Sequence, residues 1–165
     1  MVRSRLTALI ITAFALAACP ARAATTASGT ITAHVESAIA VSFNVSDFNF
    51  PNANPADVPS VPPTEGGITI AVKARGPLSM PVTLTVQAND DLRSGANVIP
   101  IDKITWTVTG SGFAPGTMSK AAAQSMGSWS GPGEHSGTFA FRFENSFDYE
   151  PGVYSATVTY TVTGP

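Results

Sequence analysis

The chain has 165 residues, of which 44% are hydrophobic and only 12% are charged, with nine basic and eleven acidic side chains. All eleven acids but only six of the basic residues follow residue 23, and no basic cluster is present. This charge pattern argues against nucleic acid and anionic membrane surfaces as partners. The length after residue 23 fits a single domain that can bury a sizeable core.

The first 23 residues are typical of a signal peptide. Arg3 and Arg5 precede an apolar run over residues 6–18, which is too short for a bilayer-spanning helix of about 20 residues. The sequence Ala21-Arg22-Ala23 has the small-x-small pattern that signal peptidase needs. We therefore expect an exported protein, with cleavage after Ala23 and one domain over residues 24–165.

The only cysteine, Cys19, leaves an alternative open. Leu16-Ala17-Ala18-Cys19 is similar to a lipoprotein cleavage site, at which Cys19 would be lipidated and anchor the chain to a membrane. With ordinary cleavage Cys19 is lost, so residues 24–165 contain no disulfide, no thiol nucleophile and no cysteine metal site.

Period-two alternation dominates the rest of the chain and predicts β-strands. The first strand is expected over residues 31–45, with Ile31, Val35 and Ile39 facing the core and a bend near 36–38. Further strands are expected at 67–73, 80–87, 98–101, 104–109, around Met126 and Trp129, at 138–145 and at 153–163. This spacing predicts an all-β fold: a two-sheet antiparallel, immunoglobulin-like sandwich.

Two segments break the strand pattern. Five prolines over residues 51–63 predict a stiff surface crossing between the sheets. Residues 119–124 contain three alanines and are expected to form at most one helical turn.

No catalytic or cofactor-binding constellation is recognisable. His34 and His135 are the only histidines and are expected at the surface, and no nucleophile elbow of the form G-x-S-x-G is present. The turn acids Asp90 and Asp91 are the best candidates for ligand contact, and calcium is the one cation that such a loop would favour. We predict no enzymatic activity, no metal site and no cofactor, with calcium as the alternative.

The two tryptophans call for different interpretations. Trp106 alternates with threonines and shares a face with Ile104 and Val108, which predicts a core position. Trp129 lies between serines beside a glycine-rich turn, which makes it a candidate for an exposed sugar contact. A carbohydrate-binding module that uses Trp129, Asp90 and Asp91 is therefore one alternative function.

Two resemblances bear on function. Trp106-Thr107-Val108 and the closing stretch Gly152 to Val162, with Tyr160-Thr161-Val162 in it, resemble the WxL-type bacterial cell-surface domains, although a tyrosine replaces the second tryptophan and valines replace both leucines. This resemblance implies an immunoglobulin-like domain at the cell surface. The chain is also similar to exported pilin-like subunits, in which a leading alternating strand completes a neighbour's sheet. Residues 31–45 are the candidate for that strand, the alternative being that they pair within their own chain.

The expectation from sequence is thus an exported structural or adhesive protein in the periplasm, at the cell surface or outside the cell. Its expected partners are other surface proteins or wall and extracellular glycans. A carbohydrate-binding module and a self-assembling fibre subunit are the alternatives.

Overall fold

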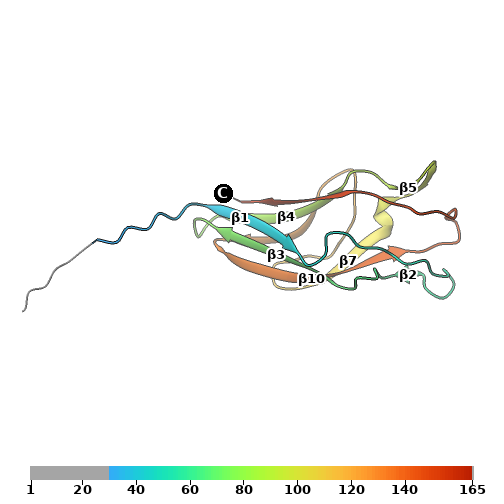
Figure 1. Cartoon of the computed structure of the whole chain (residues 1–165), viewed down its shortest axis with the longest axis horizontal. Helices are drawn as coiled ribbons and strands as arrows, with labels where there is room; N and C mark the ends of the chain where they lie inside the picture. The colour runs from blue at the N-terminus through green and yellow to red at the C-terminus, as the bar shows by residue number, and fades with distance from the viewer. Residues whose placement is uncertain (1–29, 165) are drawn as a thin grey trace, which may run out of the picture. The chain divides into compact units, whose positions relative to one another are not determined.

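A computed structural model describes residues 30–164. Chain contacts divide the protein into two units, residues 1–34 and residues 35–165. The second unit holds two stacked antiparallel sheets (Figure 1). Among the described residues there is one 3-10 turn, η1 (Ile101–Lys103), and no α-helix. Accordingly, nothing in residues 30–164 forms a helix long and apolar enough to cross a membrane.

The strands fall into two main sheets and one small hairpin. The larger sheet has the order β1-β3-β10-β7-β8, with β2 pairing the far end of β10, and the smaller has the order β11-β4-β9. The pair β5 and β6 forms a separate hairpin. The bounds are β1 Ala38–Phe43, β2 Ser60–Val61, β3 Ile68–Arg75, β4 Pro81–Ala88, β5 Leu92–Ser94, β6 Asn97–Ile99, β7 Ile104–Thr109, β8 Gly116–Thr117, β9 Gln124–Ser130, β10 Gly133–Glu144 and β11 Val158–Thr163.

Two connections run side by side, and each leads from one sheet to the other. β3 leads to β4 and β9 leads to β10, while β3 pairs β10 and β4 pairs β9. This arrangement places the first and last strands, β1 and β11, on the same side of the sandwich, since β1 lies beyond β3 and β11 lies beyond β4. The antiparallel sandwich is as expected, whereas an immunoglobulin-like connectivity stays a prediction.

The core lies between the two sheets and follows the alternation. Along β3 and β4 every second side chain is buried, and the rings of Trp106, Phe139 and Phe141 fill the centre. The prediction that Trp106 is a core residue is confirmed, and its indole N–H donates to the carbonyl of Ala114 (2.9 Å). Each such side chain contributes about 1.5–3 kcal/mol when fully buried, which suits a fold with no covalent cross-link.

One side of the sandwich is joined by backbone hydrogen bonds. The connection over residues 110–118 leaves β7 in the larger sheet and runs against β9 in the smaller one. The backbone N–H of Ala114 donates to Met126 O (2.9 Å), and that of Ser128 donates to Gly112 O (2.9 Å). Because β8, within this connection, also pairs β7, the two sheets are linked along this side.

The first strand is shorter than expected. Ile31 is 97% exposed and Val35 is 69% exposed, so the prediction that they face the core was wrong. β1 begins only at Ala38, opposite Arg75, the last residue of β3. The alternation gives the face of a residue correctly but does not show whether a partner strand is available.

Two other segments also differ from expectation. The closing strand begins at Val158, because the preceding residues make only one bridge, between Ser155 and Arg93. Residues 119–124 form no helical turn: the Ser119 hydroxyl accepts the N–H groups of Ala121 and Ala122, which bends the chain instead (3.2 and 3.3 Å).

The proline-rich segment runs over the surface as predicted, but it does not cross between the sheets: it connects β1 to β2 and β3, which all belong to the larger sheet. Before it, the ring of Phe48 stacks on Phe141 and that of Phe50 packs on Phe143. At its far end Val61 is buried in β2, which pairs β10 beyond the start of β3 and so extends the larger sheet there. The segment therefore closes one end of the core as well as crossing the surface.

Gly127 tests how tightly the core is packed. A Cβ at this position of β9 would lie 2.5 Å from the ring of Trp129. We expect Gly127→Ala to lower the free energy of unfolding by about 1–3 kcal/mol through overpacking, measured by urea denaturation. Ser128→Ala on the exposed face is the control and should change it by less than about 0.5 kcal/mol. Equal effects would contradict the packing.

Candidate functional site

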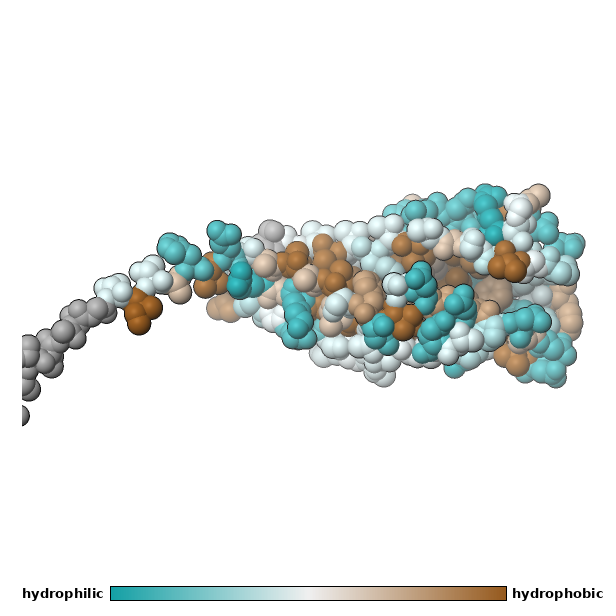
Figure 2. All heavy atoms as spheres, viewed as in Figure 1, coloured by the Kyte–Doolittle hydropathy of each residue, from teal (hydrophilic) through white to brown (hydrophobic). Residues whose placement is uncertain are grey.

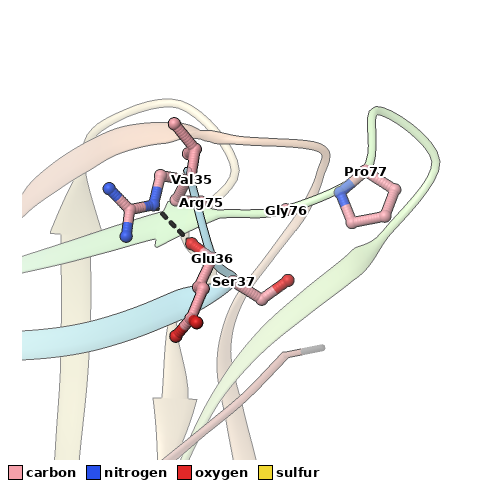
Figure 3. Close-up of a pocket in the computed structure, with 6 residues that line it drawn as sticks. All are labelled: Val35, Glu36, Ser37, Arg75, Gly76 and Pro77. Carbon is pink, nitrogen blue, oxygen red and sulfur yellow. Dashed lines mark hydrogen bonds between the residues drawn. The ribbon is translucent and has the colours of Figure 1, made fainter. Parts of the chain in front are cut away.

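The site begins where the chain enters the sandwich. The β1–β3 ladder ends at the pair Ala38 and Arg75, because Gly76-Pro77 then turns the chain toward β4 and proline has no N–H to continue the ladder. The Arg75 Nε donates to the carbonyl of Glu36 (2.6 Å) and fixes the direction of the incoming chain (Figure 3). A shallow hollow forms there, lined by Val35, Glu36, Ser37, Arg75, Gly76 and Pro77.

The residues upstream of β1 form what we call the N-terminal segment, residues 30–37. All eight are exposed and lie outside any strand, and no strand within residues 30–164 pairs with them. Their sequence still alternates, with Ile31, Ala33 and Val35 on one face and Thr32 and His34 on the other. The segment thus has the pattern of a strand without a partner.

The second part of the site is the side of the sandwich where β1 and β11 lie. The two strands face each other across the sheets, with the rings of Phe43 and Tyr160 4.8 Å apart. In contrast to the opposite side, no backbone hydrogen bond between β1 and β11 is present in the described part of the chain. Among residues 30–164 no strand pairs the outer edge of β1 or of β11, so each edge presents a row of backbone N–H and C=O groups.

The side chains along this side are only partly covered. Burial raises the pKa of the Tyr160 phenol to about 12. Figure 2 shows hydrophobic residues along the stretch of surface where β1 lies. The half-buried apolar residues are Ile39, Val41 and Phe43 on β1 and Val158, Tyr160 and Val162 on β11.

Neither edge has the usual protection against pairing. Natural edge strands carry charges, prolines or bulges that prevent another strand from adding. The sequences of β1 and β11, AIAVSF and VTYTVT, contain no charged residue and no proline. Chemically, this arrangement can exchange backbone hydrogen bonds with another strand and cover its apolar side chains.

The sugar-contact hypothesis for Trp129 is not supported by its position. The residue is 9% exposed, and its indole N–H donates to the carbonyl of Ser111 (3.0 Å). The imidazole of His135 stacks on the indole and Phe113 meets it edge-on, both with ring centres 4.7 Å away. His135 thus also lies against the core, not at the open surface as predicted, and its Nε2 is buried without a hydrogen-bond partner.

The candidate acids Asp90 and Asp91 do come together, but with cations of their own chain. Arg93 Nε donates to Asp90 (2.5 Å), and Lys120 pairs with Asp91. Asp91 also accepts the backbone N–H of Ile101 (3.1 Å). The structure therefore places these carboxylates in a cluster that joins the β4–β5 turn to the residues after β8.

No further candidate site emerges from the remaining predictions. Within residues 30–164 there is no group of three or more His, Cys, Asp or Glu side chains that could hold a metal ion. His34 is exposed in the N-terminal segment. Cys19, with its predicted lipidation, and the predicted signal peptide lie outside the described residues.

In comparisons with known proteins, no protein-family model matches the chain, and no curated protein does so either.

Sequence reasoning identified one half of the site and missed the other. The alternation marked the N-terminal segment, but nothing in the sequence shows that β1 and β11 lie on one side. The absence of charge from both strands was a usable signal, because an uncharged alternating strand without proline is the kind that natural edges avoid.

The Asp90 ion pair makes the free energy of unfolding depend on pH in the acidic range. The hydrogen bond from Arg93, followed by that from the Asp91 N–H, lowers the pKa of Asp90 from 3.8 to about 2. Because the folded pKa lies below the unfolded one, the ionised form stabilises the fold above about pH 4, and this contribution is lost as the pH falls toward 2.

We expect Asp90→Asn to be less stable than wild type at neutral pH, with the difference shrinking from pH 4 to pH 2. Urea denaturation across this range measures it. Asp102→Asn is the matched control, since Asp102 forms no ion pair among the described residues. A difference that does not change with pH would contradict the role of the Asp90 carboxylate.

The buried Nε2 of His135 gives a second stability prediction. A buried nitrogen without a hydrogen-bond partner costs about 1–3 kcal/mol, and phenylalanine keeps the stack on Trp129 without that cost. We expect His135→Phe to raise the free energy of unfolding by about 1 kcal/mol in thermal or urea denaturation. Ser136→Ala, on the exposed face of β10, should leave it nearly unchanged. Destabilisation by His135→Phe would mean that the stack requires the imidazole.

Proposed function

We propose that this protein is an exported, non-catalytic structural subunit that assembles with copies of itself, the N-terminal segment of one copy adding as a strand to another. The observation that carries the proposal is the N-terminal segment itself. It has the alternation of a half-buried strand, yet Ile31 and Val35 are exposed and β3 ends before it can pair them.

The chain also offers edges that such a strand can join. β1 and β11 have free, uncharged edges, and apolar side chains that are only half-buried lie along them. Strand addition gives affinity through main-chain hydrogen bonds and specificity through alternate side chains, and both are available here. A cell-surface or extracellular role and an immunoglobulin-like relationship belong to this proposal.

A carbohydrate-binding function has no comparable support. The ring of Trp129 is covered by His135 and Phe113, and the carboxylates of Asp90 and Asp91 are paired with Arg93 and Lys120. We therefore propose the structural function alone.

Sedimentation velocity over a range of concentrations tests the proposal. Residues 24–165 are expected to form dimers or larger species as the concentration rises. Residues 38–165 are expected to stay monomeric and to unfold as cooperatively as the longer chain, because no strand is removed. A longer chain that remains monomeric throughout would refute the proposal.

A pair of neighbouring substitutions refines this test. Val35→Asp places a charge on the apolar face of the segment and His34→Asp places it on the other face. Since burying a valine is worth about 1.5–3 kcal/mol, Val35→Asp should weaken association by at least about tenfold, and His34→Asp by much less. Both residues are exposed in the single chain, so neither change should affect its folding. An equal loss from both would show that the apolar face is not used.

A further inference from the structure

The directions of β1 and β11 decide how two copies can join. β1 starts opposite Arg75 and β11 ends opposite Thr83, so the start of one and the end of the other lie at the same end of the sandwich. Gly164 confirms this, since a Cβ there would lie 2.5 Å from Ile39 Cδ1. Figure 1 shows the C-terminus beside the start of β1. We call this the turn end, because it holds the β3–β4 turn.

The opposite end is called the loop end. It holds the β5–β6 hairpin, which follows β4, and the connection over residues 145–157, which leads from β10 to β11. β11 starts there at Val158, opposite Ala88. The two strands therefore run in opposite directions, β1 away from the turn end and β11 toward it.

An incoming N-terminal segment can run antiparallel to only one of the two edges. If it runs antiparallel to β11, its last residues lie at the loop end of the acceptor, and the donor's sandwich follows there. The acceptor's own segment leaves from its turn end, so each copy can bind the next and an open chain results. If it runs antiparallel to β1, both segments lie at the turn ends and the copies tend to close into a pair.

The exposed apolar side chains favour the open chain. Apart from those of the N-terminal segment, the large exposed hydrophobic residues in the described part of the chain lie at the two ends that successive copies would bring together. Leu78 lies at the turn end, in the β3–β4 turn. The others lie at the loop end: Val98 in β6, and Phe147 and Val153 in the connection from β10 to β11.

Side-chain size then selects a register on β11. With Val35 opposite Val158, the small Ala33 lies opposite the large Tyr160, and Ile31 lies opposite Val162. A shift of two residues in either direction would put Ile31 or Val35 against Tyr160 and would leave Val162 or Val158, respectively, without an apolar partner in residues 31–35. A shift of one residue would turn the apolar face of the segment outward.

We propose that the partner is the β11 edge of a second copy of this chain, which takes residues 31–35 antiparallel in this register. The acceptor sheet then has the order β9-β4-β11-donor and remains antiparallel throughout. The added Ile31, Ala33 and Val35 cover the half-buried side chains of β1 and β11, and Thr32 pairs with Thr161 on the outer face. This inference rests on the proposed assembly and specifies its edge, direction and register.

Disulfide cross-linking tests these three features, because residues 24–165 contain no cysteine. Thr32→Cys with Thr161→Cys places two thiols opposite each other on the outer face. Two control variants keep Thr32→Cys and place the second cysteine at Ser42 on β1 or at Thr159, two residues out of register. Thr161, Ser42 and Thr159 are all exposed in the single chain.

After mild oxidation we expect a ladder of covalent multimers for the Thr32–Thr161 pair on non-reducing gels, and at least tenfold less product for both controls. Diagonal neighbours lie about 7–8 Å apart, with their Cβ atoms somewhat closer, and this is still longer than the roughly 3.5–4.5 Å between the Cβ atoms of a disulfide. Preferential cross-linking through Ser42 or Thr159 overturns the proposed edge or register, and so does a product that stops at a dimer.

A second variant keeps the register testable if a double cysteine chain folds poorly. Ala33→Trp should weaken association at least tenfold because it meets Tyr160, while His34→Trp on the outer face should weaken it far less. Equal effects overturn the register.

The two proposals fail in different ways. If assembly itself is wrong, the unmodified chain of residues 24–165 sediments as a monomer and no pair forms a ladder. If only the edge or register is wrong, that chain still associates but the Thr32–Thr161 pair does not cross-link preferentially.

Discussion

The functional argument depends on a mismatch in length between two neighbouring segments. The alternating N-terminal sequence continues to Ile31, but its partner β3 stops at Arg75, where Gly76-Pro77 turns the chain toward β4. A β-strand gains its stability from a partner's hydrogen bonds and from cover for its apolar face, and residues 30–37 have neither. The same turn that connects the two sheets therefore leaves a strand-forming segment unpaired.

The two sides of the sandwich differ in how the backbone N–H and C=O groups at the sheet edges are satisfied. On one side the connection over residues 110–118 pairs β7 through β8 and bonds to β9, so backbone groups of both sheets are satisfied. On the other side β1 and β11 meet only through side chains such as Phe43 and Tyr160. Most of the largest fully buried side chains are on β3, β4, β7 and β10, and none of them is on β1 or β11.

The sequence predicted the strands well because alternation reports directly on which face of a strand is buried. It predicted β3, β4 and β7 to within about two residues, and Trp106 as core, but it placed the start of β10 at residue 138, whereas the strand begins at Gly133. It failed for Ile31 and Val35, since a period of two specifies a face and not the presence of a partner. Which edges would lie together depends on strand order, and strand order is a long-range property that local patterns do not contain.

Trp129 shows a different limit of sequence reasoning. Its serine neighbours and the nearby glycines are typical of an exposed loop, yet two glycines make room for its ring: Gly127, which lies directly under the indole, and Gly112 from the connection after β7, which adopts a positive φ of 81°. The covering rings, Phe113 and His135, come from other parts of the chain. The Asp90 and Asp91 cluster is similar, since Lys120 is distant in sequence and could not be assigned as their partner.

Unprotected sheet edges expose a monomeric protein to aggregation by strand pairing. The other edges of the two main sheets in this chain are protected. β8 has only two residues and follows Pro115, and β9 is bonded to the connection over residues 110–118. In the two main sheets of the described residues, protection is absent on the side that holds β1 and β11, and the same chain supplies a segment with the matching period of two. An edge that has no role in assembly would not need a segment of the same chain that can pair with it. The coincidence of a free strand, two uncharged edges and apolar residues at both ends is what a self-complementary building block requires.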